Sequence, residues 1–199
     1  LLAIRLQEHS AIGVGTRAKW ISQGSPSVRR FAIEISGEAS GDTPDLTARI
    51  LALGESDDVE DRVAVARYLR RTPLACTHEV LPRLARDASA GVRALTMESL
   101  AARMCRSERA KVLVSEGLRD QSPRVRLLSI AAVETVFADQ QAIGEVLRDV
   151  VADSDDFCRC AAFCLLIRSG EIEARTIGAL AREIGSGPES SVNDIIREM

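Results

Sequence analysis

Apolar residues recur three and four positions apart along most of this chain, with polar residues between them. In the segment 73–87, for example, Val80, Leu81, Leu84 and Ala85 follow this spacing. Residues spaced in this way line one face of an α-helix. No segment shows the sustained alternation of β-branched and polar residues that is typical of strands. The pattern therefore predicts an all-α protein.

The predicted helices come in pairs, and the second helix of most pairs begins with the same short motif, an apolar residue followed by arginine; Asp61 takes the apolar position in the second pair. When the arginines are aligned, the intervals between them are 33, 31, 33, 33 and 34 residues. Such a regular period is the signature of a repeat architecture. The aligned column contains Arg29, Arg62, Arg93, Arg126, Arg159 and finally Asn193, and the shorter first helices are expected over 43–55, 73–87, 108–120, 141–153 and 171–185.

A two-helix unit of this size cannot bury its own apolar faces, so the units must stack side by side around one continuous core. We therefore expect a single α-solenoid domain over residues 1–199, made of about six two-helix repeats. Their approximate bounds are 1–36, 43–70, 73–104, 107–138, 140–169 and 171–199.

The turn between the two helices of a unit contains residues that favour a helix start. Ser25-Pro26 and Ser122-Pro123 predict an N-cap hydroxyl followed by proline in the first helical position. The acidic run 153–156 places carboxylates where the helix dipole favours them, and the similar run 55–61 is interpreted as a solvated turn.

A second column contains aspartate six residues before the arginine, at Asp87, Asp120 and Asp153. Aspartate followed six residues later by an arginine that an aliphatic residue precedes, in helix pairs of this period, resembles the HEAT and HEAT-like (PBS-lyase-type) repeat family. The resemblance implies a right-handed superhelix in which aspartates and arginines of neighbouring units pair as a ladder along the inner helices. The implied ladder residues are Asp87, Arg93, Asp120, Arg126, Asp153, Arg159, Arg29 and Arg62.

The ladder is expected to fade at both ends of the chain. Gln23 and Ser56 stand where the first two units would have the aspartate, and the last unit has Gly187 and Asn193 in place of the pair. Repeats that cap a solenoid are commonly atypical in this way.

Composition limits the function. The chain is 46% hydrophobic and 28% charged, with a net charge of -3, which argues against a dedicated polyanion binder. Aromatic residues make up only 3%, so stacking platforms for bases are scarce. The arginine column could in principle track a phosphate backbone, but the aspartate column predicts that these side chains are used in pairing.

No motif predicts a cofactor or a metal. The segment 13–19, GVGTRAK, lacks the Gly-Lys-Ser/Thr ending of a phosphate loop and is interpreted as a helix start. Cys160 and Cys164 are one helical turn apart without a nearby histidine, and the segment 153–164 lacks the glycine and glutamate of a calcium loop. The chain has five cysteines, which we expect to be reduced core thiols: Cys76, Cys105, Cys158, Cys160 and Cys164.

Catalysis is not expected. Only His9 and His78 are available for acid–base chemistry near neutral pH, and no local motif activates either histidine. No apolar run is long enough to span a membrane, and the first residues lack the features of a signal peptide, so we expect a cytoplasmic location.

The leading functional expectation is a non-catalytic scaffold or adaptor whose second helices present a concave surface to another protein or peptide. Two alternatives remain, nucleic-acid binding similar to the HEAT-like DNA glycosylases and small-molecule binding related to the HEAT-like bilin lyases. Edge helices at the solenoid ends would also permit self-association. The residues expected on the concave surface are Arg30, Glu34, Arg67, Glu98 and Arg124.

Overall fold

The chain is all-helical in the part that the structure, a computed structural model, describes: residues 12–37, 42–72, 79–102 and 106–170, which contain no strand. The α-helices in these ranges are α2 (Val14–Gln23), α3 (Pro26–Ser36), α4 (Pro44–Ala52), α5 (Val59–Arg71), α6 (Val80–Ala85), α7 (Ala90–Ala102), α8 (Glu108–Gly117), α9 (Pro123–Val136), α10 (Gln140–Leu147) and α11 (Asp156–Arg168). Short 3₁₀ turns, η1 (Leu53–Glu55) and η3 (Val150–Ala152), extend α4 and α10.

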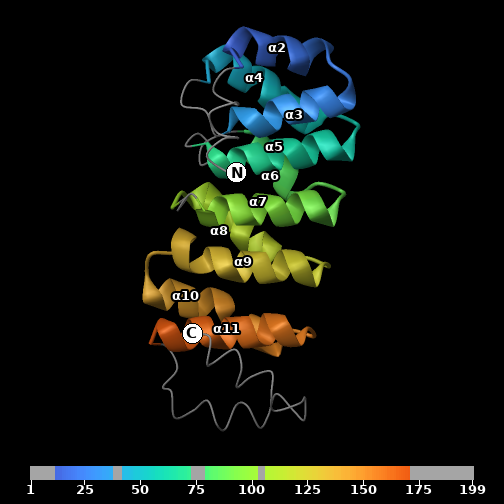
Figure 1. Cartoon of the computed structure of the whole chain (residues 1–199). Helices are drawn as coiled ribbons and strands as arrows, with labels where there is room; N and C mark the ends of the chain where they lie inside the picture. Colours follow the sequence, from blue (N-terminus) through green and yellow to red (C-terminus); the bar gives the residue numbers. More distant parts are fainter. Residues whose placement is uncertain (1–11, 38–41, 73–78, 103–105, 171–199) are drawn as a thin grey trace, which may run out of the picture.

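The helices form two layers (Figure 1). Helices α3, α5, α7, α9 and α11 lie one beside the next in chain order, and each contacts the following one. We call these five helices the front layer. Helices α2, α4, α6, α8 and α10 form a back layer, and α2, α6, α8 and α10 each pack against the front helix that follows them in the chain. Helices that follow one another in the chain are therefore mostly neighbours in space.

The front helices begin after capped turns, but not all caps are as predicted. Pro26 and Pro123 do occupy the first helical turn of α3 and α9. Ser25 and Ser122 are N-cap residues, yet their hydroxyls make no capping hydrogen bond, so this expectation is wrong. The turn before α9 is held instead by Asp120, whose carboxylate accepts the backbone N–H of Ser122 at 2.8 Å.

The core lies between the two layers and is continuous from α2 to α11. At the end of α8, a Cβ on Gly117 would stand 2.2 Å from Ser129 Oγ, so this close approach of α8 to α9 requires glycine. Cys158 is buried in the aliphatic position of the repeat, whereas Cys160 and Cys164 are partly exposed free thiols. The largest fully buried side chains are Tyr68, Ile33, Leu46, Ile50, Leu69, Leu81, Leu84, Met97, Leu100, Leu113, Ile130 and Leu147.

Several sequence predictions fall outside the described residues. The sixth repeat at 171–199, with its helix at 171–185, is one of them, and so are His9, His78, Cys76 and Cys105. Within the described ranges, no helix is both long and apolar enough to cross a bilayer.

Candidate functional site

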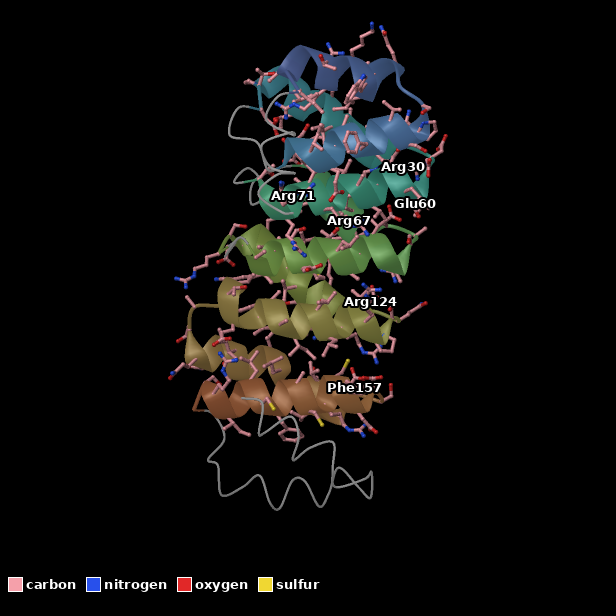
Figure 2. All side chains as sticks on the ribbon, viewed as in Figure 1. Arg30, Glu60, Arg67, Arg71, Arg124 and Phe157 are labelled. Carbon is pink, nitrogen blue, oxygen red and sulfur yellow. The ribbon has the colours of Figure 1, made fainter. Side chains whose placement is uncertain are left out.

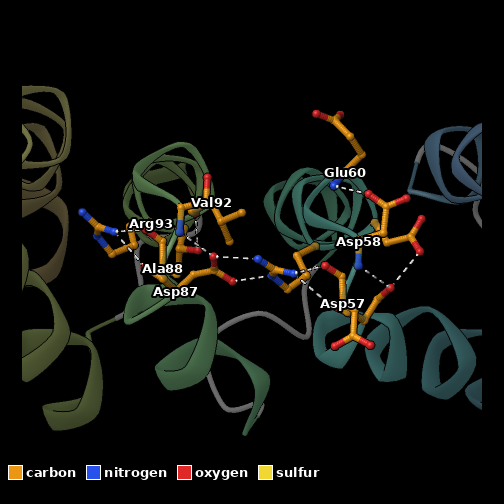
Figure 3. Close-up of polar contacts among 12 residues, drawn as sticks. Asp57, Asp58, Glu60, Asp87, Ala88, Val92 and Arg93 are labelled. Carbon is orange, nitrogen blue, oxygen red and sulfur yellow. Dashed lines mark hydrogen bonds and ion pairs between the residues drawn. The ribbon is translucent and has the colours of Figure 1, made fainter.

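The arginine column makes ion pairs between neighbouring units, and in Figure 3 dashed lines join the carboxylate of Asp87 to the arginine of the preceding unit. Arg93 at the start of α7 donates from Nε and Nη2 to both carboxylate oxygens of Asp120, at 2.7 and 2.8 Å. Asp120 lies in the turn of the following unit, before α9. The same two-pronged contact joins Arg62 to Asp87 and Arg126 to Asp153. We call these pairs the ladder.

Each ladder arginine also holds the turn of its own unit. Arg93 Nη1 donates to the backbone carbonyls of Asp87 and Ala88, at 2.8 and 3.1 Å. Asp87 in turn accepts the backbone N–H of Ser89, two residues on. A single guanidinium thus ties its own turn to the next one, so the geometry of each junction is set by one arginine and two adjacent turns.

The ladder does not fade at the junction between the first two units, contrary to the sequence expectation. Arg29 donates to both oxygens of Asp61, at 3.2 and 2.6 Å. Asp61 stands where the other units have an aliphatic residue, and its side chain is 0% exposed. Ser56, in the usual aspartate position, donates its hydroxyl to Asp61 at 3.0 Å and accepts the N–H of Asp58. The carboxylate that pairs with Arg29 therefore comes from position 61 and not from position 56.

Within the described residues, Arg159 contacts only its own unit. Its Nη1 donates to the carbonyl of Asp153 at 2.6 Å, and Nη2 pairs with Asp156 on the same helix. Gly187 and Asn193, where fading was expected, lie outside the described residues.

The ladder shifts the titration of its carboxylates. The hydrogen bond from Arg93 holds the pKa of Asp120 below its ordinary value, and burial opposes this shift. Arg126 lowers the pKa of Asp153 in the same way, against the same opposing effect of burial. A carboxyl with a lowered pKa in the folded state stabilises the fold above its unfolded pKa, which is about 4. That stabilisation is lost as the pH falls through the folded pKa.

Acid is therefore expected to unfold the protein through these pairs. The free energy of unfolding, measured with urea, should be nearly constant from about pH 7 to 5 and decrease below about pH 4. Asp153→Asn should be less stable at neutral pH but lose less stability on acidification. Glu108→Gln, which changes an exposed carboxylate, should keep the native pH dependence. If the free energy of unfolding fell equally steeply with pH in Asp153→Asn and in the native chain, the ladder pairs would not be the cause of the acid sensitivity.

The ladder leaves little capacity for phosphate. A guanidinium has five N–H donors. Arg62, Arg93 and Arg126 each place hydrogen bonds from Nε, Nη1 and Nη2 on a carboxylate and on carbonyl oxygens. A phosphate would have to displace an aspartate held at close range, which disfavours the arginine column as a nucleic-acid track.

The outward side chains of α3, α5, α7, α9 and α11 form a second candidate site, which we call the front face (Figure 2). All five residues expected on a binding surface belong to these helices: Arg30, Glu34, Arg67, Glu98 and Arg124. Arg30 is partly buried, and Glu98 is half-buried, while the other three are exposed.

Neighbouring front helices use most of these charges in ion pairs. Arg71 on α5 pairs with Glu34 on α3 at 3.1 Å, and Arg70 pairs with Glu98 on α7. Arg30 lies 4.0 Å from Glu60. Such solvent-exposed pairs stabilise little, about 0–1 kcal/mol each, but they neutralise the charges involved.

Large apolar side chains are also exposed on this face. Phe157 at the start of α11 is 66% exposed, and Phe31 on α3 is 45% exposed. Among the described residues, the exposed large hydrophobic side chains are Val28, Phe31, Val59, Leu127, Phe157 and Val112, and only Val112 belongs to the back layer.

A buried polar network joins the first two units, and sequence reasoning missed it. Arg17 of α2 donates to Asp42 at 2.6 Å, and Asp42 also accepts the hydroxyl of Tyr68 on α5 at 3.2 Å. Thr47 on α4 lies 3.1 Å from the same hydroxyl. Burial raises the pKa of Tyr68 to about 12, so the phenol stays protonated and donates to Asp42. The network fixes α2 and α4 against α5.

The other sequence features have structural roles. The segment 13–19 starts α2, with Gly13 as its N-cap. Asp58 and Asp155 cap α5 and α11 through their carboxylates. In the described part of the chain, no group of three or more His, Cys, Asp or Glu side chains could hold a metal ion. A surface hollow lies on the back layer between α8 and η3, lined by Ser115, Leu118, Arg119, Val146, Asp149, Val150 and Asp153.

No protein-family model matches the chain, and a search of curated proteins found no match either.

Proposed function

We propose that this chain is a non-catalytic protein-binding module, a right-handed α-solenoid of HEAT-like repeats that binds another protein or peptide on its front face. The resemblance of its aspartate and arginine columns to HEAT-like repeats supports the solenoid. So do the chain-order stacking of the front helices and the ladder between their units. Stacked helix pairs of this kind provide an extended concave surface through their geometry alone.

The observation that carries the proposal is the distribution of exposed apolar side chains over the two layers. Both layers contribute to the same core, yet Phe31, Leu127 and Phe157 are exposed on the front layer, and among the described residues only Val112 is comparably exposed on the back. Exposed apolar side chains next to paired charges are typical of protein–protein contact surfaces. The front layer is therefore the better candidate for a contact surface than the back layer.

The two alternative functions have less support. Nucleic-acid binding would need free arginines along the column. The guanidinium groups of Arg62, Arg93 and Arg126 are instead paired with aspartates. Binding of a bilin-like molecule would need a deep apolar cavity. The hollow between α8 and η3 has a mixed lining, in which charged residues such as Arg119 and Asp149 lie beside aliphatic ones.

Selection from a random displayed-peptide library tests the proposal. Peptides that bind the native chain are expected to lose binding to Leu127→Ser and to Phe157→Ser, because these changes remove apolar contact area from the front face. Val112→Ser, which makes the same kind of change on an exposed valine of the back layer, is the matched control and should retain binding. Enrichment of no peptide, or equal loss of binding in the control, would contradict a front-face binding site.

A further inference from the structure

The charges on the front face are not balanced. The five front helices contain the carboxylates Glu34, Glu60, Asp61, Glu98, Glu134 and Asp156, and each of them has an arginine within 4.0 Å. The same helices contain more arginines than carboxylates, and no lysine. Arg67 and Arg124 are both exposed and make no ion pair or hydrogen bond within the described part of the chain. The unpaired charges on these helices are therefore both positive.

Aliphatic side chains lie between these two arginines. Arg70 on α5 pairs with Glu98 on α7, and these helices run in the same direction. Three residues earlier on each helix, Arg67 comes opposite Leu95, which is partly exposed. On the next front helix, Leu127 is 37% exposed and lies one turn after Arg124. A strip from Arg67 over Leu95 and Leu127 to Arg124 is thus positive at both ends and apolar in the middle.

The length of this strip follows from helix geometry. Helices α5 and α9 are separated by two front-layer spacings, and packed helices lie about 8–10 Å apart. Arg67 lies five residues after its ladder arginine and Arg124 two residues before its own, which adds an axial offset of about 10 Å. The two guanidinium-bearing positions are therefore about 20 Å apart. An extended peptide covers that distance in about six residues.

We propose that the partner segment is an extended acidic peptide with two carboxylates about six residues apart and an aliphatic residue between them. The carboxylates pair with Arg67 and Arg124, and the aliphatic side chain packs on Leu95 and Leu127. Charge complementarity supports this occupant, because every carboxylate of the front helices already has a partner. The inference deepens the proposed function and rests on it.

A nucleic acid fits the strip less well. Single strands carry a phosphate at every nucleotide, so several phosphates would lie over Leu95 and Leu127, where the strip has no cation. Binding of single strands also relies on aromatic side chains that stack on the bases, and the middle of the strip is aliphatic.

Fluorescence anisotropy with synthetic peptides tests this inference on the full chain. The probe is a fluorescein-labelled Gly/Ser peptide with two glutamates about six residues apart and a leucine midway. Comparison peptides have glutamine for glutamate, or the glutamates adjacent. A fluorescein-labelled oligothymidine of similar length tests nucleic-acid binding. We expect the spaced acidic peptide to bind most tightly.

Variants assign the binding to the two arginines. Arg67→Gln and Arg124→Gln are each expected to weaken binding of the spaced peptide by about fivefold to tenfold, because each loses one charge-assisted contact. Arg148→Gln, at an exposed arginine that follows α10 in the back layer, is the matched control and should bind as the native chain does. Thermal unfolding of all three should match the native protein.

Each contrary result has a separate meaning. Equal binding of the glutamine peptide, unchanged binding by Arg67→Gln, or no binding of any peptide would overturn the inference. Tighter binding of oligothymidine than of the acidic peptide would overturn it in favour of a nucleic-acid surface. If library peptides bind at Leu127 and Phe157 but are insensitive to Arg67→Gln and Arg124→Gln, the proposed function stands and only the acidic partner is wrong.

Discussion

Arg126→Ala is expected to lower the free energy of unfolding by about 2–4 kcal/mol. The Arg126 side chain is 11% exposed and its partner Asp153 is 8% exposed, so the substitution leaves a carboxylate charged and almost out of reach of water. It also removes the donor to the backbone carbonyls of Asp120 and Gln121. Urea or thermal unfolding followed by circular dichroism measures this loss.

A second variant separates the stranded charge from lost packing. Asp153→Asn keeps an oxygen that can accept the N–H of Asp155, as Asp153 does at 2.8 Å, but carries no charge. Arg126→Ala with Asp153→Asn should therefore be more stable than Arg126→Ala alone, which simple addition of two destabilising changes would not produce. Arg148→Ala should change stability by no more than about 0.5 kcal/mol. An unchanged melting transition in Arg126→Ala would refute the structural role of the ladder.

The first junction gives the second large effect. Asp61→Val restores the aliphatic residue of the other units but removes the carboxylate that Arg29 and Ser56 contact, and should cost about 2–3 kcal/mol. Ser56 occupies the same turn position as Asp87, Asp120 and Asp153, and accepts the N–H two residues on as they do. Adding Ser56→Asp to Asp61→Val should therefore recover most of the lost stability.

Whether Ser56→Asp stabilises or destabilises the fold should depend on the residue at position 61. In the native chain, an aspartate at position 56 would stand beside the buried Asp61 carboxylate and compete for Arg29, so Ser56→Asp alone should destabilise. In the Asp61→Val chain the same substitution should stabilise. Equilibrium unfolding of the four variants in this double-mutant cycle measures the difference. Ser56→Asp acting with the same sign in both backgrounds would show that the two positions do not serve one arginine.

Much of the helical pattern could be predicted from the sequence because it is encoded locally. Apolar spacing predicts each helix, and the recurrence of Arg93, Arg126 and Arg159 at a fixed interval predicts the pairing into units. Asp61 could not be predicted in the same way, because alignment places it in an aliphatic column, and its side chain reaches Arg29 from another backbone position. A charged residue at a buried column position was the signal that could have revealed it.

Side-chain contacts between segments far apart in the chain could not be predicted from the sequence. Arg17, Asp42 and Tyr68 come from three segments, and none of them belongs to a repeated motif. On the front face, the sequence placed Glu34 and Glu98 on the surface, but only their position beside α5 shows that Arg71 and Arg70 neutralise them. The imbalance that leaves Arg67 and Arg124 unpaired therefore depends on which helices are neighbours.

The ladder makes the chain able to grow by whole units. Arg93, Arg126 and Arg159 are 33 residues apart, and so are Asp87, Asp120 and Asp153. Any 33-residue segment cut in the turn contains one ladder aspartate, which can pair with the preceding arginine, and one ladder arginine, which can pair with the aspartate of the next turn. In-frame duplication of this segment would create a new junction in which every ladder residue has its partner. The protein, and with it the front face, could therefore become longer by whole units that use the same contacts.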